Sequence, residues 1–113
     1  MSILRNLKVW RRSNLNENIY RAVSDAELND IANFGLRCKP GGYGYETVKL
    51  FALEHNDADS FGKLNQNYDN LPFSVIKIAI PGKVFSEAFQ FEADGMQAIS
   101  IEEKCLNLLT IIY

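Results

Sequence analysis

The chain has 113 residues, of which 47% are hydrophobic and 12% aromatic, enough to fill the core of one domain. Its net charge of -2 argues against a dedicated nucleic-acid binder, and without a run of about 18 apolar residues we expect no transmembrane helix. The N-terminus lacks the apolar core of a signal peptide, and Cys38 and Cys105 are isolated. We therefore expect reduced thiols in a cytoplasmic protein. The single histidine, His55, argues against a histidine-rich metal site, and we expect no metal.

The first segment carries apolar residues at helical spacing, with arginine and lysine on the other side. We expect a short amphipathic helix that packs on the domain, followed by a polar connector from Ser13 to Asn18. On this basis residues 1–17 form the N-terminal helix and connector. Residues 18–113 form a single α+β domain.

A short strand at 19–23 runs into a capped helix. Ile19, Arg21 and Val23 share one face of the strand. Ser24 and Glu27 have the Ser-x-x-Glu spacing of a capping box at the helix start. Because a cation among apolar residues needs an anionic partner, Arg21 is expected to bind a carboxylate of this chain or a phosphate of a ligand.

The helix that begins after Ser24 is expected to bury Leu28, Ile31 and Ala32 and to end at Phe34, with Gly35 as a left-handed cap. Residues 36–39 are expected to form a short strand. The loop at 40–45 combines three glycines with Tyr43 and Tyr45. Glycine permits close approach of a ligand and tyrosine offers a stacking face, although a plain hairpin loop with packed tyrosines explains the pattern equally well.

The later segments alternate between strand and helix patterns. We predict a strand at 47–53, a helix at 56–66 that packs through Ala58, Phe61 and Leu64, a loop at 67–72 and a central strand at 73–80. Strands at 88–91 and 97–101 flank a turn at Asp94-Gly95, and a helical turn at 102–106 precedes a last strand at 108–113. This order predicts an α+β fold with two or three helices and an antiparallel-rich sheet.

Three segments resemble a known group of proteins. They are Ile19-Tyr20-Arg21-Ala22-Val23-Ser24 with its helix, Glu46-Thr47-Val48-Lys49-Leu50-Phe51-Ala52 with the helix from Asp57, and Asp94-Gly95 with the strand and the Glu103-Lys104-Cys105-Leu106-Asn107 segment after it. In this order they resemble the C-terminal toxin domains of bacterial Rhs and contact-dependent-inhibition proteins. Their layout is similar to the core of the ADP-ribosyltransferase fold.

The resemblance implies an NAD-dependent toxin used in competition between bacteria. Its cofactor would be NAD, and its partners a macromolecular acceptor and a cognate immunity protein. It would act in the cytoplasm, including that of a target bacterium. The implied NAD-binding residues are Tyr20, Arg21, Tyr43, Tyr45 and Phe51, and the implied catalytic residues are Arg21, Glu46, Lys49 and Glu102. The serine-threonine-serine set of the arginine-class transferases is replaced here by Phe51-Ala52-Leu53.

Two other functions remain open. In a toxin ribonuclease, Arg21, Glu46, Lys49 and His55 would supply the acid, the base and the phosphate-binding groups. In a non-catalytic binding or inhibitor protein, Arg21 would be held by an internal carboxylate such as Glu46, Glu92 or Asp94. Both enzyme hypotheses predict that Arg21, the tyrosine loop and an acid from 92–103 line one cleft. The binding hypothesis predicts no open cleft beside Arg21.

Overall fold

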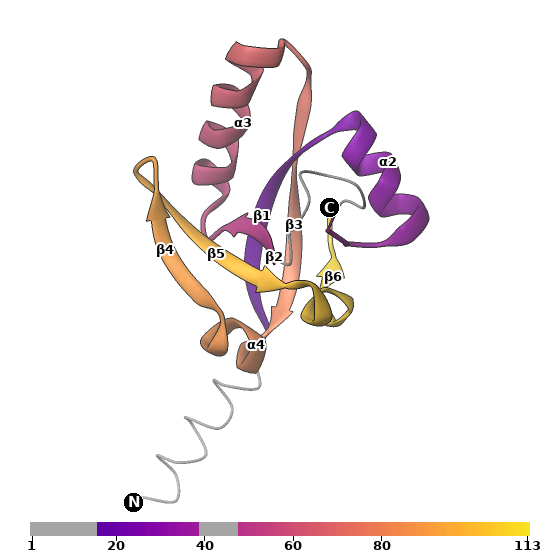
Figure 1. The fold of residues 1–113 in the computed structure, drawn as a ribbon, viewed down its shortest axis with the longest axis vertical. Helices are drawn as coiled ribbons and strands as arrows, with labels where there is room; N and C mark the ends of the chain where they lie inside the picture. The colour runs from indigo at the N-terminus through magenta and orange to yellow at the C-terminus, as the bar shows by residue number, and fades with distance from the viewer. Residues whose placement is uncertain (1–15, 39–47) are drawn as a thin grey trace, which may run out of the picture.

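The computed structural model describes residues 16–38 and 48–113 (Figure 1). The described residues form one antiparallel sheet of six strands, in the order β4-β5-β2-β1-β3-β6. The elements are β1 (Asn16–Ser24), α2 (Asp25–Phe34), β2 (Val48–Ala52), α3 (His55–Asp69), β3 (Phe73–Pro81), α4 (Gly82–Glu87), β4 (Phe89–Ala93), β5 (Met96–Glu102), the 3-10 helix η1 (Glu103–Leu108) and β6 (Thr110–Ile111). The predicted α+β fold is confirmed.

Strand β1 lies in the middle of the sheet and begins at Asn16, within the predicted connector. It pairs with β3 along its whole length, from Asn16 opposite Pro81 to Ser24 opposite Phe73. Its register with β2 is a single pair, Tyr20 opposite Ala52. As predicted, β3 is an interior strand of the sheet, although only the two-residue β6 lies beyond it. Because Tyr20 opposite Ala52 is the last register pair, strands β1 and β2 separate from Arg21 onward.

The core lies on one face of this sheet. Ile19 and Val23 of β1 are almost fully buried there, and α2 packs against them through Ile31. The other strands bury a matching set on the same face, as expected when side chains alternate along each strand. These residues are Phe51, Ile76, Ile78, Ile80, Ile99 and Ile101. Helices α2 and α3 lie on opposite sides of β1 and β3 (Figure 1).

Helix α2 begins and ends where its sequence predicts. The Ser24 hydroxyl accepts a hydrogen bond from the Glu27 N–H at 3.1 Å, and Gly35 ends the helix with φ of 76°. Ala32 is exposed rather than packed. The strand predicted at 36–39 is absent from residues 36–38, which are irregular, and Lys39 lies outside the described residues. Arg37 turns back onto Asp30 of α2, which holds this segment against the helix instead of extending it.

Helix α3 is longer than predicted. It continues through residues 67–69, which were expected to be a loop, and ends at Asn70 with φ of 55°. Ala58 is buried as predicted, but Phe61 and Leu64 are 42% and 39% exposed. Gly62 is buried against β3, where an added Cβ would lie 2.4 Å from the ring of Phe73. A glycine here thus lets the helix approach the sheet closely.

The C-terminal part is a hairpin followed by a short return to the sheet. Asp94 and Gly95 have φ of 52° and 77° and join β4 to β5 as the predicted turn. The strand predicted at 108–113 is reduced to β6, because η1 extends to Leu108. The predicted N-terminal helix and the tyrosine loop at 40–45 lie outside the described residues. In the described ranges, no helix has the length and apolar character needed to span a membrane.

Candidate functional site

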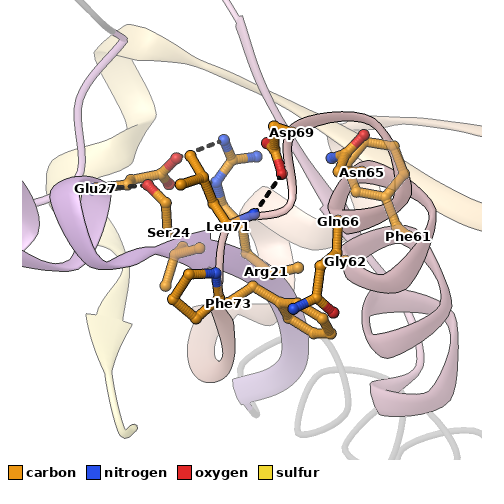
Figure 2. A pocket seen from close by; sticks show the side chains of 13 residues that line it. Arg21, Ser24, Glu27, Phe61, Gly62, Asn65, Gln66, Asp69, Leu71 and Phe73 are labelled. Atoms are coloured by element: carbon orange, nitrogen blue, oxygen red, sulfur yellow. Dashed lines mark hydrogen bonds and ion pairs between the residues drawn. The ribbon is translucent and has the colours of Figure 1, made fainter.

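Arg21 forms a two-point ion pair with Glu27. Its Nε donates to one carboxylate oxygen at 2.6 Å and its Nη2 to the other at 3.1 Å (Figure 2). The two side chains are 23% and 25% exposed. The strand-to-helix corner at Ser24 makes this pair possible, because it turns the first turn of α2 back over the strand that carries Arg21. Glu27 was assigned to the capping box with Ser24, but its carboxylate binds Arg21 instead.

The same guanidinium also occupies the gap between the two separating strands. Its Nη1 donates to the Leu50 carbonyl of β2 at 2.6 Å. Its Cζ lies 6.0 Å from the centre of the Phe51 ring. The side chain thereby satisfies a backbone acceptor near the point where the β1–β2 register ends. Arg21 therefore couples β1, β2 and α2 at one point.

Lys49 brings a second cation to Glu27. Its Nζ lies 3.6 Å from a Glu27 oxygen and donates to the Arg37 carbonyl at 3.0 Å, and its side chain is only 11% exposed. Burial and the neighbouring charge of Arg21 lower the pKa of Lys49, which Glu27 offsets only in part. Burial alone would raise the pKa of Glu27, but Arg21 and Lys49 outweigh it and lower that pKa. The three side chains, which we call the Arg21 cluster, carry a net charge of +1.

Two cavities open beside Arg21. The smaller, of about 200 Å³, is polar and lies between the end of β1 and the C-terminal half of α3 (Figure 2). Ser24, Glu27, Asn65, Gln66 and Asp69 line it. The larger, of about 370 Å³, is mostly apolar and runs between α3 and strands β1, β2 and β5. We call this larger cavity the apolar cleft. Arg21, Ala22 and Phe61 line both, so Arg21 stands where the two cavities meet.

Four of the predicted site residues line the apolar cleft. They are Tyr20, Arg21, Lys49 and Phe51. Lys49 and Arg21 come together as the ribonuclease hypothesis expected of neighbouring strands. The ring of Tyr20 also meets His55 edge-on, with 5.7 Å between ring centres. These four residues come from both faces of the sheet, because Tyr20 and Arg21 alternate along β1, and Phe51 is only 3% exposed in the core.

The remaining predicted residues are elsewhere. Glu102 is exposed at the end of β5, pairs with Lys104 at 3.2 Å and lines neither cavity. Glu46, Tyr43 and Tyr45 lie outside the described residues. In the described ranges the acid that lines the apolar cleft is Asp57, at the start of α3, where it accepts a hydrogen bond from the Gln97 N–H at 3.2 Å.

Sequence reasoning missed Glu27 as the partner of Arg21. The three carboxylates considered were Glu46, Glu92 and Asp94, whereas Glu27 was assigned to helix capping. The signal was present, because the capping-box glutamate lies six residues after Arg21, just beyond the end of the strand. Asp57, Gln97 and Phe61 of the apolar cleft were also missed as site residues. Their approach to Arg21 depends on how α3 and β5 pack, which no local pattern specifies.

The chain shows no match to any protein-family model, curated protein or solved structure. The arrangement around Arg21 therefore has to be interpreted from its own chemistry. It offers two cations with one carboxylate, an apolar cavity that opens from them, and amide and carboxylate groups in the adjoining polar cavity. Within residues 16–38 and 48–113, no three histidine, cysteine, aspartate or glutamate side chains gather in a way that could hold a metal ion.

Proposed function

We propose that this chain is an NAD-dependent ADP-ribosyltransferase of the bacterial toxin type and that NAD binds at Arg21. One observation carries the proposal: the lining of the apolar cleft includes Arg21 and Lys49, the two cations of the Arg21 cluster. A dinucleotide needs both features, because its diphosphate is anionic and its nicotinamide ring is flat and largely apolar. An open cleft beside Arg21 agrees with the enzyme hypotheses, but the acid from 92–103 that both of them also predicted does not line it.

Arg21 has the donors that a phosphate requires. A guanidinium has five N–H groups, and within the described residues three of them are used, two by Glu27 and one by the Leu50 carbonyl. The other two belong to Nη1 and Nη2. A phosphate bound there leaves the Glu27 contact intact and adds a second negative charge beside Lys49. The cluster can therefore accept an anion without rearranging.

In the proposed reaction, the bond between the ribose C1 and the nicotinamide nitrogen breaks. The bonding electron pair leaves with nicotinamide, which departs neutral. A nucleophile of a macromolecular acceptor then bonds to C1 and loses its proton to a base. A carboxylate stabilises the developing positive charge on the ribose. Glu102, which lines neither cavity, is the candidate that the resemblance supplies for this role, and Glu46 is the second candidate. A cognate immunity protein is the further partner that the resemblance implies.

The test is nicotinamide release from NAD by the purified full chain, with and without a bacterial lysate. We expect release by the unaltered chain and a loss of about 100-fold or more in Arg21→Ala. Arg37→Ala is the matched control, because Arg37 forms the same kind of two-point pair but lines neither cavity. Glu46→Gln and Glu102→Gln separate the two candidate carboxylates. The absence of any nicotinamide release by the unaltered chain would overturn the proposal.

A second candidate, binding without catalysis, has one observation in its favour. Glu27 already supplies Arg21 with a two-point partner inside the protein, which is what a structural ion pair requires. Calorimetric titration with NAD separates the two candidates when combined with the release assay. Binding without release favours the non-catalytic function, whereas RNA cleavage that needs no NAD favours the ribonuclease.

A further inference from the structure

Strand β4 forms one outer edge of the sheet. It pairs with β5 on one side and is the terminal strand of the order on the other (Figure 1). Its five residues are Phe89-Gln90-Phe91-Glu92-Ala93. Edge strands are protected from further pairing by short length, by charged side chains, by proline or by a bulge, and β4 has only five residues and the single charge of Glu92, without proline, lysine or a bulge. Among residues 16–38 and 48–113 no strand pairs with its outer side, which therefore presents backbone groups suited to another strand.

The two phenylalanines of β4 form an exposed apolar surface. Their rings stack with 5.5 Å between centres and 17° between planes, and Phe89 is 68% exposed. Leu50 of β2 shares this face of the sheet, because both Phe89 and Leu50 pair with Ser100, and it is 46% exposed. A stacked aromatic pair at a sheet edge is costly to leave in water and gains by association.

The hairpin defines which backbone groups face outward. Ala93 and Met96 close a two-residue turn, so the N–H and C=O groups of Ala93 both bond to Met96. In an antiparallel pair every second residue of β4 then bonds to β5 in the same way. Phe89 and Phe91 thus bond to β5. Gln90 and Glu92 direct their N–H and C=O groups to the open edge, and their side chains are exposed.

The open edge is complementary to itself. When two copies of β4 run antiparallel about a two-fold axis at Phe91, Gln90 of each copy lies opposite Glu92 of the other. Both are outward-bonding residues, so the backbone pattern matches as well. The amide of Gln90 can donate to the carboxylate, and no two glutamates face each other. All four phenylalanine rings then lie on one face of the extended sheet.

We propose that two copies of this chain associate through β4 in this register and form one continuous twelve-stranded sheet. The interface is isologous, as expected of a two-fold dimer. Because five-residue strands with few flanking side chains give a small contact, the dimer is weak and dissociates on dilution. The proposal does not depend on the function of the Arg21 cluster.

The test is sedimentation velocity of the full chain over about 5–500 µM, a range suited to weak association. We expect a concentration-dependent dimer. Gln90→Glu places a charge opposite Glu92 of the other copy and weakens the dimer by about tenfold at low salt, whereas Gln90→Lys preserves or strengthens it. Gln90→Pro removes the outward N–H without removing a β4–β5 hydrogen bond and yields a monomer.

The matched controls are Asn67→Glu and Asn67→Lys, which make the same charge changes at an exposed position of α3. They should leave the equilibrium unchanged, and circular dichroism of every variant checks that the fold is retained. A monomer at all concentrations overturns the proposal. Equal effects of Gln90→Glu and Gln90→Lys overturn it as well, because the register requires opposite ones.

Discussion

Two arginine–carboxylate pairs attach neighbouring segments to helix α2. Their hydrogen-bond distances are similar, but their exposure and their neighbours differ. Arg21 contacts Glu27 with two hydrogen bonds of 2.6 and 3.1 Å, and Arg37 contacts Asp30 with two of 2.6 and 3.0 Å. The first pair is about one quarter exposed and lies on a central strand. The second is more exposed and follows the end of the helix. The same contact thus occurs in two electrostatic environments.

The neighbours of the two pairs differ more than the pairs themselves. Arg21 has the Leu50 carbonyl, Lys49 and two cavities around it. Arg37 has its guanidinium 4.2 Å from the ring centre of Phe34, which is itself 66% exposed. Lys49 connects the two regions, because its Nζ donates to the Arg37 carbonyl and lies close to Glu27. An ion pair becomes a candidate ligand site through what surrounds it, rather than through its own distances.

The largest difference between the two pairs is expected in stability when each arginine is replaced by alanine in turn. Arg21→Ala leaves Glu27 with only the longer contact to Lys49, in the described residues, and leaves the Leu50 carbonyl without its donor. We expect a loss of about 2–4 kcal/mol in the free energy of unfolding, because one charge of a largely buried pair is left behind. Arg37→Ala should cost much less, since solvent screens its pair. Denaturant unfolding measures both, and equal losses would contradict the distinction.

A second test changes the shape of the cavity beside Arg21 and leaves the Arg37 pair unaltered. Gly62 and Phe73 line the polar cavity beside Arg21, and an added Cβ at Gly62 would lie 2.4 Å from the Phe73 ring. Gly62→Ala must therefore push α3 away from the sheet, and we expect a loss of about 1–3 kcal/mol in the free energy of unfolding. Ser60→Ala, at an exposed position of the same helix, is the control. If Gly62→Ala and Ser60→Ala have the same free energy of unfolding, α3 does not determine the shape of this cavity.

Local patterns predicted the parts of the fold that local forces determine. The strand that carries Arg21, the Ser24 cap, the Gly35 end of α2 and the Asp94-Gly95 turn all appear as expected. Each depends on residues within a few positions of one another, so side-chain alternation and backbone preference are sufficient. The strand predicted at 36–39 is absent from residues 36–38, because an ion pair to the preceding helix competes with extension.

The site was predicted less completely because it depends on packing between distant elements. Arg21 was identified as a cation in need of a partner, and the meeting of Arg21 with Lys49 followed once β1 and β2 proved to be neighbours. Ala58 was correctly placed inward, but Phe61 was not, because α3 leaves part of its apolar face beside the cavities instead of the core. No periodicity in one helix reveals how much of the sheet lies beneath it.

The smallest expected effect is a difference in the pH dependence of stability. The pKa of Glu27 is lowered in the folded protein despite its burial, because Arg21 and Lys49 favour the charged form. Its stabilising contribution is therefore complete above the ordinary value of 4.5 and is lost as the pH falls through the folded value. Glu27→Gln should remove this part of the acid limb, so that its unfolding free energy falls less steeply than that of the unaltered chain below about pH 4.5. Glu87→Gln, at the exposed end of α4, corrects for the loss of a carboxylate as such. If Glu27→Gln and Glu87→Gln give the same acid limb, the cations of the Arg21 cluster do not act on Glu27 as their distances imply.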